Sequence, residues 1–220
     1  MLLQASLAHC PPVNAATRHR SNFHWLGQIA FVWLTLIAAC QTNAADSAKR
    51  PPARWLTLSG CRFLSEEHSD GDSFHVKYGN REFIFRLYFA DAPETDPGLK
   101  DRIKEQCKYF GVKSEEILKT GEAAKKFTAE TLKRSFTVTT RWQNAMGRSR
   151  LQRYYAQIDA GGQDLATLLV SRGLARAKGT LAILPDGTRA KDHMEKLHNI
   201  EAEAKARHVG IWAISRQAGK

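Results

Sequence analysis

After a Pro-rich stretch, apolar and polar positions begin to alternate along the chain as they do in β-strands. Residues 55–58 and 61–64 are rich in strand-forming side chains, and residues 73–78 alternate strictly. Gly79-Asn80 supplies turn residues, and residues 82–89 alternate again, less cleanly. The pattern therefore predicts a strand followed by a β-hairpin.

The next part of the chain changes to a helical period and then returns to strands. Residues 97–120 read as short helical turns broken at Gly111, whereas residues 121–135 place apolar side chains on one face of a better helix. Residues 136–142 and 154–158 are β-branched and aromatic, which is typical of two paired strands.

Two further helices are predicted towards the C-terminus. Asp164 caps a helix that runs through Arg172 and is ended by Gly173, and residues 191–208 form a last helix that ends near Gly210. Because the strands come in consecutive sets rather than in regular alternation with helices, the order favours an α+β fold. We expect an antiparallel sheet or barrel, not a doubly wound parallel sheet.

The N-terminal region has the layout of an export signal. Residues 26–39 form a mostly apolar run preceded by two arginines, and the run is short for a membrane span, which needs about 20 residues. Residues 42–44 have the small-x-small form of a signal-peptidase site. Residues 37–40 resemble a bacterial lipobox, in which Cys40 would be lipidated. Secretion into the medium or periplasm and lipid anchoring both remain open.

These features predict four segments. They are a signal peptide or lipoprotein signal (1–45), a small, charged and Pro-rich linker (46–53), a folded functional domain (54–213) and a C-terminal tail (214–220).

Composition and charge narrow the class of partner. The 220 residues are 43% hydrophobic and 25% charged, which excludes a disordered or fibrous chain. The formal net charge is +11, and beyond residue 45 it is still +9, from 31 basic and 22 acidic residues. A domain this basic favours polyanions such as nucleic acid, an anionic membrane or an acidic polysaccharide.

Four cysteines divide between leader and domain. Cys10 and Cys40 lie in or at the edge of the leader, so Cys61 and Cys107 remain in the domain. In an oxidising compartment this pair predicts a disulfide, and two separate thiols are the alternative. No Cys–His spacing resembles a zinc site.

Three carboxylates and an arginine gather around one strand end. The hairpin sets Asp72 beside Arg86, and Asp91 and Glu94 follow just past its end. Carboxylates bind hard divalent cations and orient water, and arginine grips phosphate. Asp-Gly-Asp on its own is often a turn, but together these residues predict phosphodiester hydrolysis.

The same residues resemble the staphylococcal nuclease (thermonuclease) family. The resemblance covers residues 55–213, and its most specific part is the Asp-Gly-Asp, Arg and Asp-x-Pro-Glu-Thr core. The matching blocks, in chain order, are residues 70–73, 85–95, 121–124, 155–158, 164–175, 201–205 and 210–212.

The resemblance implies a five-stranded oligonucleotide-binding (OB-fold) β-barrel with three α-helices, acting as a Ca²⁺-dependent nuclease on DNA and RNA. Such enzymes cut the 5′ phosphorus–oxygen bond and leave 3′-phosphates. It also implies that Asp72, Asp91 and the backbone carbonyl of Ala92 bind Ca²⁺. By the same resemblance, Glu94 would position and activate the attacking water, and Arg86 would hold the scissile phosphate.

The second arginine of the family has two candidates. Counting back from Ala156 along the strand gives Arg153, whereas matching the Gly-Arg dipeptide gives Arg148. We prefer Arg153, because strand register fixes where a side chain points.

Other departures from the family concern the substrate track. Ser73 replaces the usual Thr, and residues 178–183 lack the aromatic side chains that stack on a bound base. Trp142, Tyr154 and Tyr109 are candidate substitutes, although packing is the more ordinary role for each. The segment 96–120 carries basic residues that would either widen the substrate track or form a solvated face: Lys100, Arg102, Lys104, Lys108 and Lys113.

The sequence therefore predicts an exported Ca²⁺-dependent nuclease that acts as a monomer on DNA and RNA. It implies no stable protein partner, and it implies membrane attachment only if Cys40 is lipidated. The alternative is a non-catalytic barrel at the cell envelope that holds nucleic acid or another polyanion.

Overall fold

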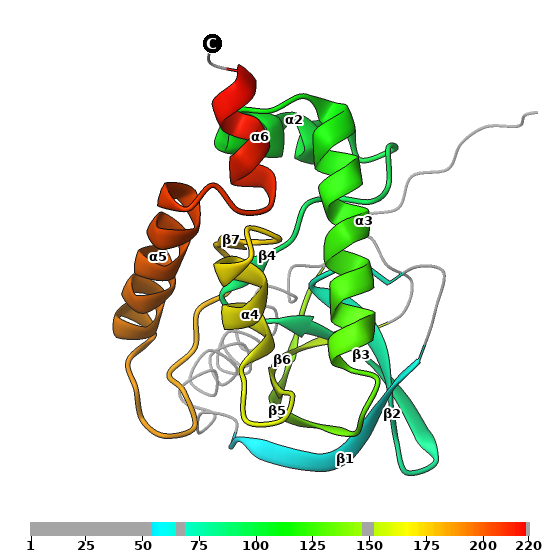
Figure 1. Ribbon diagram of the computed structural model, residues 1–220. Coiled ribbons are helices and arrows are strands. Elements are labelled where there is room, and N and C mark those ends of the chain that lie inside the picture. The colour runs from blue at the N-terminus through cyan, green and yellow to red at the C-terminus, as the bar shows by residue number, and fades with distance from the viewer. Residues whose placement is uncertain (1–53, 65–68, 147–151, 219–220) are drawn as a thin grey trace, which may run out of the picture. The chain divides into compact units, whose positions relative to one another are not determined.

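The computed structural model describes residues 54–64, 69–146 and 152–218 (Figure 1). They belong to a unit that begins at Pro51. The predicted leader and linker lie outside the described residues. The strands are β1 (Leu56–Leu64), β2 (Ser73–Tyr78), β3 (Arg81–Leu87), β4 (Ala90–Asp91), β5 (Phe136–Asn144), β6 (Arg153–Asp159) and β7 (Arg176–Ala177). The helices are α2 (Lys100–Phe110), α3 (Ser114–Thr131), α4 (Leu165–Ser171), α5 (Ala190–Ala206) and α6 (Ile211–Ala218).

Five strands close into a barrel in the order β1-β2-β3-β6-β5. All neighbouring strands are antiparallel except β3 and β6, which run parallel with Arg86 opposite Tyr155. The predicted hairpin is present, with Ser73 opposite Arg86 and Tyr78 opposite Arg81. The predicted α+β class and five-stranded barrel are therefore confirmed.

The barrel interior is filled by alternate side chains of these strands. Alternate residues of a strand point to the same face of the sheet. The completely buried side chains on the inner face include Phe74, Val76, Phe85, Val138 and Ala156. Two irregularities bend the ladder. One lies between Leu58 and Cys61 in β1, and the other lies between Thr140 and Asn144 in β5.

A strained turn connects β3 to the two-stranded sheet of β4 and β7. Phe89 is buried and has φ +64°, a backbone conformation that a bulky residue rarely adopts. Ala90 N donates to Tyr88 O within this turn, and Asp91, five residues after Arg86, lies within hydrogen-bonding distance of the Arg86 side chain. The strained backbone therefore lies between Arg86 and Asp91, two of the predicted site residues.

Helix α3 differs from the prediction. It begins at Ser114 and continues through Gly121, where the sequence pattern placed the start of a helix. A Cβ at Gly121 would lie 2.4 Å from the Glu94 carbonyl oxygen, so the missing side chain allows the helix to cross the loop after β4. The predicted break at Gly111 is real, because this left-handed residue ends α2.

The C-terminal helices follow the expected caps but exceed the expected number. Asp164 accepts a hydrogen bond from Thr167 N and starts α4. Helix α6 begins at Ile211 and includes residues assigned above to a tail, and Trp212 packs against Phe110 of α2. The described residues hold five helices where three were predicted, because residues 97–120 form α2 and the start of α3, and α6 follows Gly210.

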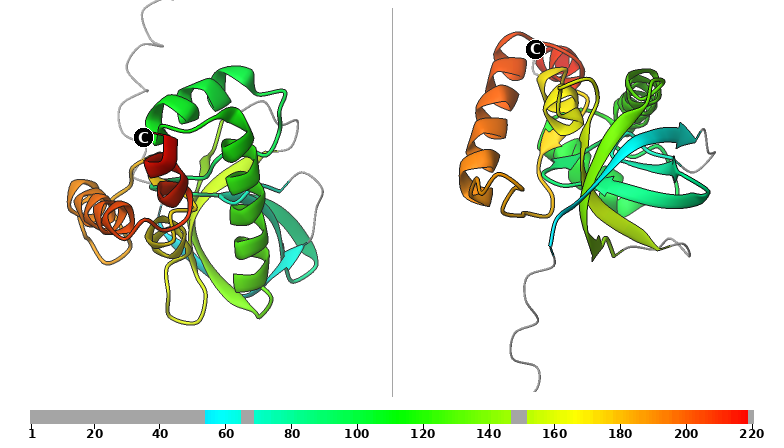
Figure 2. Two further views of the ribbon diagram at one scale, coloured as in Figure 1. Left: turned by 45° about the horizontal axis from the view of Figure 1, so that its top comes forward. Right: turned by 90° about the horizontal axis from the view of Figure 1, so that it is seen from below.

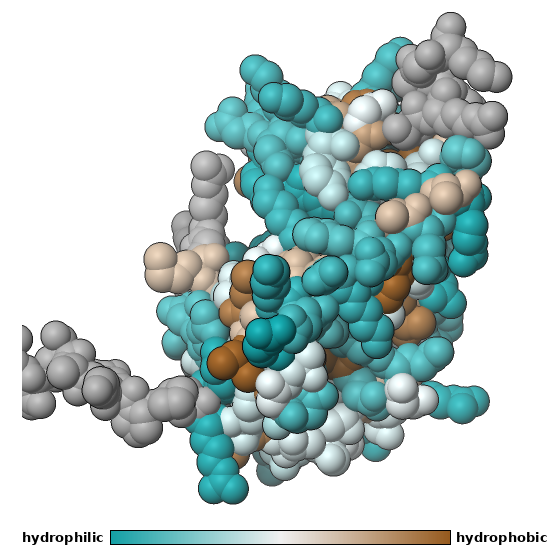
Figure 3. Space-filling model, turned by 90° about the vertical axis from the view of Figure 1, so that its left-hand side faces the viewer, coloured by the Kyte–Doolittle hydropathy of each residue, from teal (hydrophilic) through white to brown (hydrophobic). Residues whose placement is uncertain are grey.

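The helices lie on the outside of the barrel. Helices α4 and α5 lie side by side next to it, and α3 runs along another part of it (Figures 1 and 2). The face on the α5 side is mostly hydrophilic, with small apolar areas between hydrophilic side chains (Figure 3). Among the described residues, no helix has the length and apolar character needed to cross a membrane.

Candidate active site

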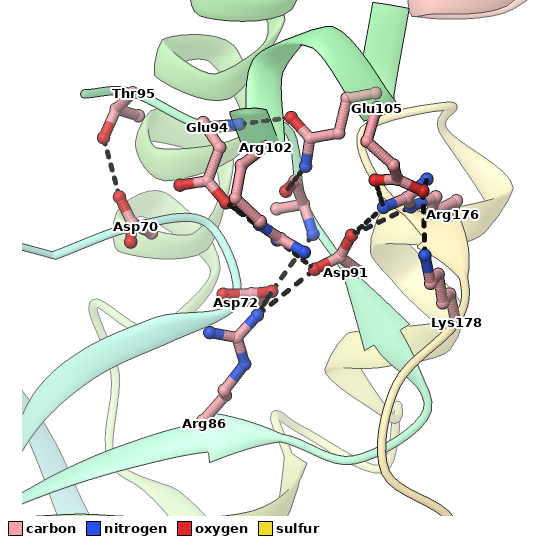
Figure 4. A network of polar contacts seen from close by, with 12 residues as sticks. Asp70, Asp72, Arg86, Asp91, Glu94, Thr95, Arg102, Glu105, Arg176 and Lys178 are labelled. Atoms are coloured by element: carbon pink, nitrogen blue, oxygen red, sulfur yellow. Dashed lines mark hydrogen bonds and ion pairs between the residues drawn. The ribbon is translucent and has the colours of Figure 1, made fainter. Parts of the chain in front are cut away.

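The end of the β2–β3 hairpin and strand β4 bring three predicted residues together. Arg86 extends from β3 and donates through Nη2 to Asp72 Oδ2 at 3.1 Å and to Asp91 Oδ1 at 3.2 Å (Figure 4). Both carboxylates are buried, whereas the Arg86 side chain is 22% exposed. One guanidinium therefore joins the two aspartates and still reaches solvent.

The fourth predicted residue, Glu94, joins this group through an arginine of α2. Arg102 donates through Nε to Glu94 Oε1 at 2.8 Å and through Nη2 to Asp91 Oδ1 at 2.7 Å. Figure 4 shows the Arg102 and Arg86 side chains approaching Asp91 from different elements. The sequence marked Arg102 only as one of several basic residues, so its place between two carboxylates is a finding of the structure.

A third arginine binds the remaining oxygen of Asp91. Arg176 of β7 is completely buried and donates through Nε to Asp91 Oδ2 at 2.8 Å. Its other nitrogens form a two-bonded pair with Glu105 of α2, which also accepts from Lys178 at 2.8 Å. Arg176, Glu105 and Lys178 escaped the sequence reasoning, because their partners are 71 to 85 residues away.

Gln106 fixes the loop that carries Glu94. Its buried side chain accepts from Glu94 N at 2.9 Å and donates to Ala92 O at 3.0 Å. Ala92 N donates in turn to Asp72 Oδ2 at 3.1 Å. The backbone from Ala92 to Glu94 is therefore held from both sides, and Thr95 Oγ1 anchors its end on Asp70.

Burial and the three arginines set the protonation of the acidic residues. Burial raises the pKa of Asp72 to about 6, although Arg86 opposes the shift. Burial alone would raise the pKa of Asp91. The opposing effect of Arg102 and Arg176 is larger, so this pKa lies below its usual range. Hydrogen bonds from Arg176 lower the pKa of Glu105 to about 2. Asp91 and Glu105 are therefore anionic at neutral pH.

The carboxylate and carbonyl oxygens of the site are of the chemical kind that binds a divalent cation, although arginines bind to the carboxylates in this structure. Within the described ranges, no three His, Cys, Asp or Glu residues are grouped closely enough to hold a metal ion. Both oxygens of Asp91 accept from arginines, and the Ala92 carbonyl accepts from Gln106. Asp72 Oδ1 and Glu94 Oε2 accept no hydrogen bond from the described residues, and carboxylate oxygens are the ligands that Ca²⁺ prefers. A cation at Asp91 would have to displace an arginine.

The two candidates for the family's second arginine have different outcomes. Arg148 lies outside the described residues. Arg153 lies opposite Ile84, on the same face of the sheet as Arg86 and two residues before Tyr155. Among the described residues it makes no hydrogen bond or ion pair with the carboxylates, so the structure does not bring Arg153 into the cluster around Asp91.

The candidate base-stacking residues have packing roles. Trp142 and Tyr154 meet edge to face at 5.0 Å, and Trp142 also packs against Phe83 at the barrel. The Tyr109 hydroxyl donates to the buried carboxylate of Glu201, and the Arg176 guanidinium lies 4.8 Å from the centre of the Tyr109 ring. The packing role is therefore the one that the structure favours for these three aromatics.

The predicted disulfide between Cys61 and Cys107 is wrong, because both thiols are free. Cys61 is buried in the barrel core and donates to Leu58 O at 3.3 Å. Cys107 lies on α2 against a second apolar cluster, with Ile103 and Phe110. The two cysteines therefore belong to different parts of the core.

Comparison with known proteins gives a family match. A family model described as "Staphylococcal nuclease homologue" matches residues 84–214, which include Arg86, Asp91, Glu94, Arg102 and Arg176. No curated protein matches the chain. The family match supports a nuclease-like function for the domain.

Proposed function

Since the chain belongs to the staphylococcal nuclease homologue family, we propose that it hydrolyses phosphodiester bonds of DNA and RNA. One observation carries the proposal: Asp72, Arg86, Asp91 and Glu94, from three separate segments, meet in a single ion-pair network. Cleavage of the 5′ phosphorus–oxygen bond, leaving a 3′-phosphate, is the reaction expected from the family resemblance.

Arg86 is the residue that we assign to the scissile phosphate. Its guanidinium is charged at all accessible pH values, because Asp72 and Asp91 raise its pKa further. It is 22% exposed at the edge of the network. A guanidinium binds two phosphate oxygens through parallel hydrogen bonds and stabilises the charge that develops on them during attack by water.

Asp72, Asp91 and the Ala92 carbonyl are the groups that we propose hold Ca²⁺. When bound, this ion would polarise the phosphate and help to ionise an attacking water. Glu94 orients that water and accepts its proton. Gln106 supports this role, because it holds the backbone of Glu94 at a fixed distance from Ala92.

We further propose, from the sequence of the first 45 residues alone, that the protein is exported. Secretion, periplasmic release and anchoring through Cys40 are distinguished by the mass of the mature N-terminus. We expect the exported protein to act as a monomer on nucleic acid.

The experiment that tests the function incubates the purified protein with single-stranded DNA, with Ca²⁺ or with chelator. We expect cutting with Ca²⁺ alone, and a loss of at least about 100-fold in Glu94→Gln, the scale of a lost general base. Glu122→Gln removes an exposed carboxylate of α3 and serves as the matched control.

The second candidate is a barrel that binds nucleic acid without cutting it. It is favoured by the three arginines that occupy the oxygens of Asp91. Binding that chelator leaves unchanged, with no cutting under either condition, would support this candidate and contradict the nuclease.

A further inference from the structure

Arg102 occupies an unusual position for a residue of a hydrolytic site. Its guanidinium bridges Asp91 and Glu94, which are the proposed cation ligand and the proposed water-orienting carboxylate. While this bridge exists, one oxygen of each carboxylate is unavailable to a metal ion or to water. The proposed function therefore requires Arg102 to move or to be displaced.

Arg102 differs in burial and in hydrogen bonding from Arg176, another arginine that helps to neutralise Asp91. Arg176 is 0% exposed and is fixed at once by Asp91 and by both oxygens of Glu105. The Arg102 side chain is 39% exposed, and its Nη1 has no hydrogen-bond partner among the described residues. Arg176 is built in, whereas Arg102 can turn towards solvent by rotation of its long side chain.

Arg102 and Arg86 also share a target. Both donate through Nη2 to the same oxygen of Asp91, at 2.7 Å and 3.2 Å. Two partly exposed guanidinium groups that reach one carboxylate oxygen can also reach one phosphate oxygen that binds next to them. Arginine pairs of this kind bind phosphate strongly, because each charge-assisted hydrogen bond from an N–H group to a phosphate oxygen is short and directional.

We propose that Arg102 is a substrate-binding arginine that the site's own carboxylates hold until cation and nucleic acid arrive. On cation binding, Arg102 releases Asp91 and Glu94, and its guanidinium then binds a phosphate of the substrate beside Arg86. Helix α2 thus supplies the second substrate-binding arginine, a role for which the sequence favours Arg153. The proposal rests on the proposed nuclease function, since it uses the same carboxylates and the same substrate.

The exchange has a signature that a purely structural role lacks, because removal of Arg102 changes two affinities in opposite directions. Arg102→Gln frees Glu94 Oε1 and removes one of the two arginine donors to Asp91 Oδ1, so Ca²⁺ binds more tightly, by about 2- to 5-fold, the scale of one partly exposed ion pair. The same variant loses a phosphate contact, so nucleic acid binds more weakly when Ca²⁺ is present.

The first arm of the test is Ca²⁺ titration of the full chain by calorimetry, without nucleic acid. Lys104→Gln is the matched control, because it removes one positive charge from an exposed position two residues along α2. Tighter Ca²⁺ binding in Arg102→Gln than in Lys104→Gln supports the proposal. Equal or weaker Ca²⁺ binding overturns it.

The second arm measures binding of a fluorescent phosphorothioate single strand by anisotropy at several salt concentrations, with its integrity checked on a gel. With Ca²⁺, Arg102→Gln should reduce the slope of log K against log salt by about 0.7, the contribution of one phosphate contact in single strands. In chelator the slope should not change, because Asp91 and Glu94 then hold Arg102. An equal change under both conditions, or none, overturns the proposal.

Arg153→Gln and Arg102→Lys complete the set. Arg102→Lys should keep part of the Ca²⁺-linked binding, since a lysine retains the charge but not the paired hydrogen bonds. If Arg153→Gln alone shows the Ca²⁺-linked loss, Arg153 is the second arginine and the proposal for Arg102 is wrong. Loss of cutting in Glu94→Gln together with control-like behaviour of Arg102→Gln would leave the nuclease function standing and reject only this inference.

Discussion

At the scale of single residues, the site depends on buried polar groups whose hydrogen-bond partners lie within the protein. Gln106 serves two backbone groups, Ala92 O and Glu94 N, and is itself completely buried. Buried hydrogen-bonding groups that lose their partner cost more than the bond contributes, since water cannot replace it. This asymmetry makes the amide of Gln106 a sensitive point of the loop.

Replacing Gln106 by Met keeps the length of the side chain but removes both hydrogen bonds. We expect the free energy of unfolding to fall by about 1–3 kcal/mol. We also expect turnover to fall more than affinity for DNA, because Glu94 loses its anchor. Denaturant unfolding and steady-state kinetics check the two effects, with exposed Gln163→Met as the control. Unchanged stability would show that the loop is held by other contacts.

Glu105 gives a prediction about acid. Hydrogen bonds from Arg176 lower its pKa to about 2 from an ordinary value of 4.5. A carboxylate with a lowered folded-state pKa stabilises the fold above the unfolded-state pKa, and this contribution is lost as the pH falls through the folded-state value. Its side chain is 45% exposed, so solvent screening reduces the contribution to about 1 kcal/mol.

The measurement compares the wild type with Glu105→Gln by chemical unfolding from pH 7 to pH 2. The difference in unfolding free energy should be constant above pH 5 and shrink between about pH 4.5 and pH 2. Other acidic groups titrate equally in both proteins, so their contributions cancel in the difference in unfolding free energy. A difference that is independent of pH over this range would contradict the ionic role of Glu105.

At the scale of secondary-structure elements, the close crossing of α3 over the loop after β4 sets the position of Glu94. Glycine in a helix interior ordinarily costs about 1 kcal/mol relative to alanine. At Gly121 the sign is reversed, because an added Cβ would lie 2.4 Å from Glu94 O and 2.7 Å from Pro93 O. Backbone atoms at that distance must move.

Gly121→Ala should therefore lower the free energy of unfolding by a net of about 1–2 kcal/mol, despite the better helix propensity of alanine. It should also reduce cutting, because the shift displaces the backbone of Glu94. Thermal unfolding and activity assays test both, and Glu122→Ala on the exposed face is the control. A gain in stability would mean that α3 and the loop lie further apart than described.

The same crossing shows why some elements of the fold could be predicted from the sequence and others could not. The β2–β3 hairpin was predicted because alternation and the Gly79-Asn80 turn fix its register locally, and Asp72 then falls beside Arg86. The start of α3 was misplaced because Gly121 looks like a helix boundary until its contact with Glu94 is known. Local patterns carry no information about such approaches.

The site shows the same division. Four of its acidic and basic residues follow from spacing and from family resemblance. Arg102 and Arg176 do not, since their roles arise when α2 and β7 are placed against Asp91. Basic residues at a charged surface look alike in sequence, so tertiary placement alone distinguishes the buried Arg176 from its solvated neighbours.

At the scale of the whole molecule, the barrel is closed and should open as one unit. Cys61 lies in its interior at 0% exposure, and burial raises the pKa of its thiol to about 11. Cys107 lies on α2, outside the barrel and partly exposed. The two free thiols therefore report on different events, a global opening at Cys61 and the local surroundings of α2 at Cys107.

We expect a thiol-alkylating reagent at pH 7.5 to modify Cys107 in the native protein and Cys61 only when the barrel unfolds. Peptide mass mapping resolves the two positions and separates them from Cys10 and Cys40. The modification rate of Cys61 should rise with denaturant along the same curve as global unfolding, because a closed hydrogen-bonded ring has no free edge strand to detach. Modification of Cys61 at the rate of Cys107 would show that β1 separates locally, and recovery of a Cys61–Cys107 linked peptide would contradict the free thiols.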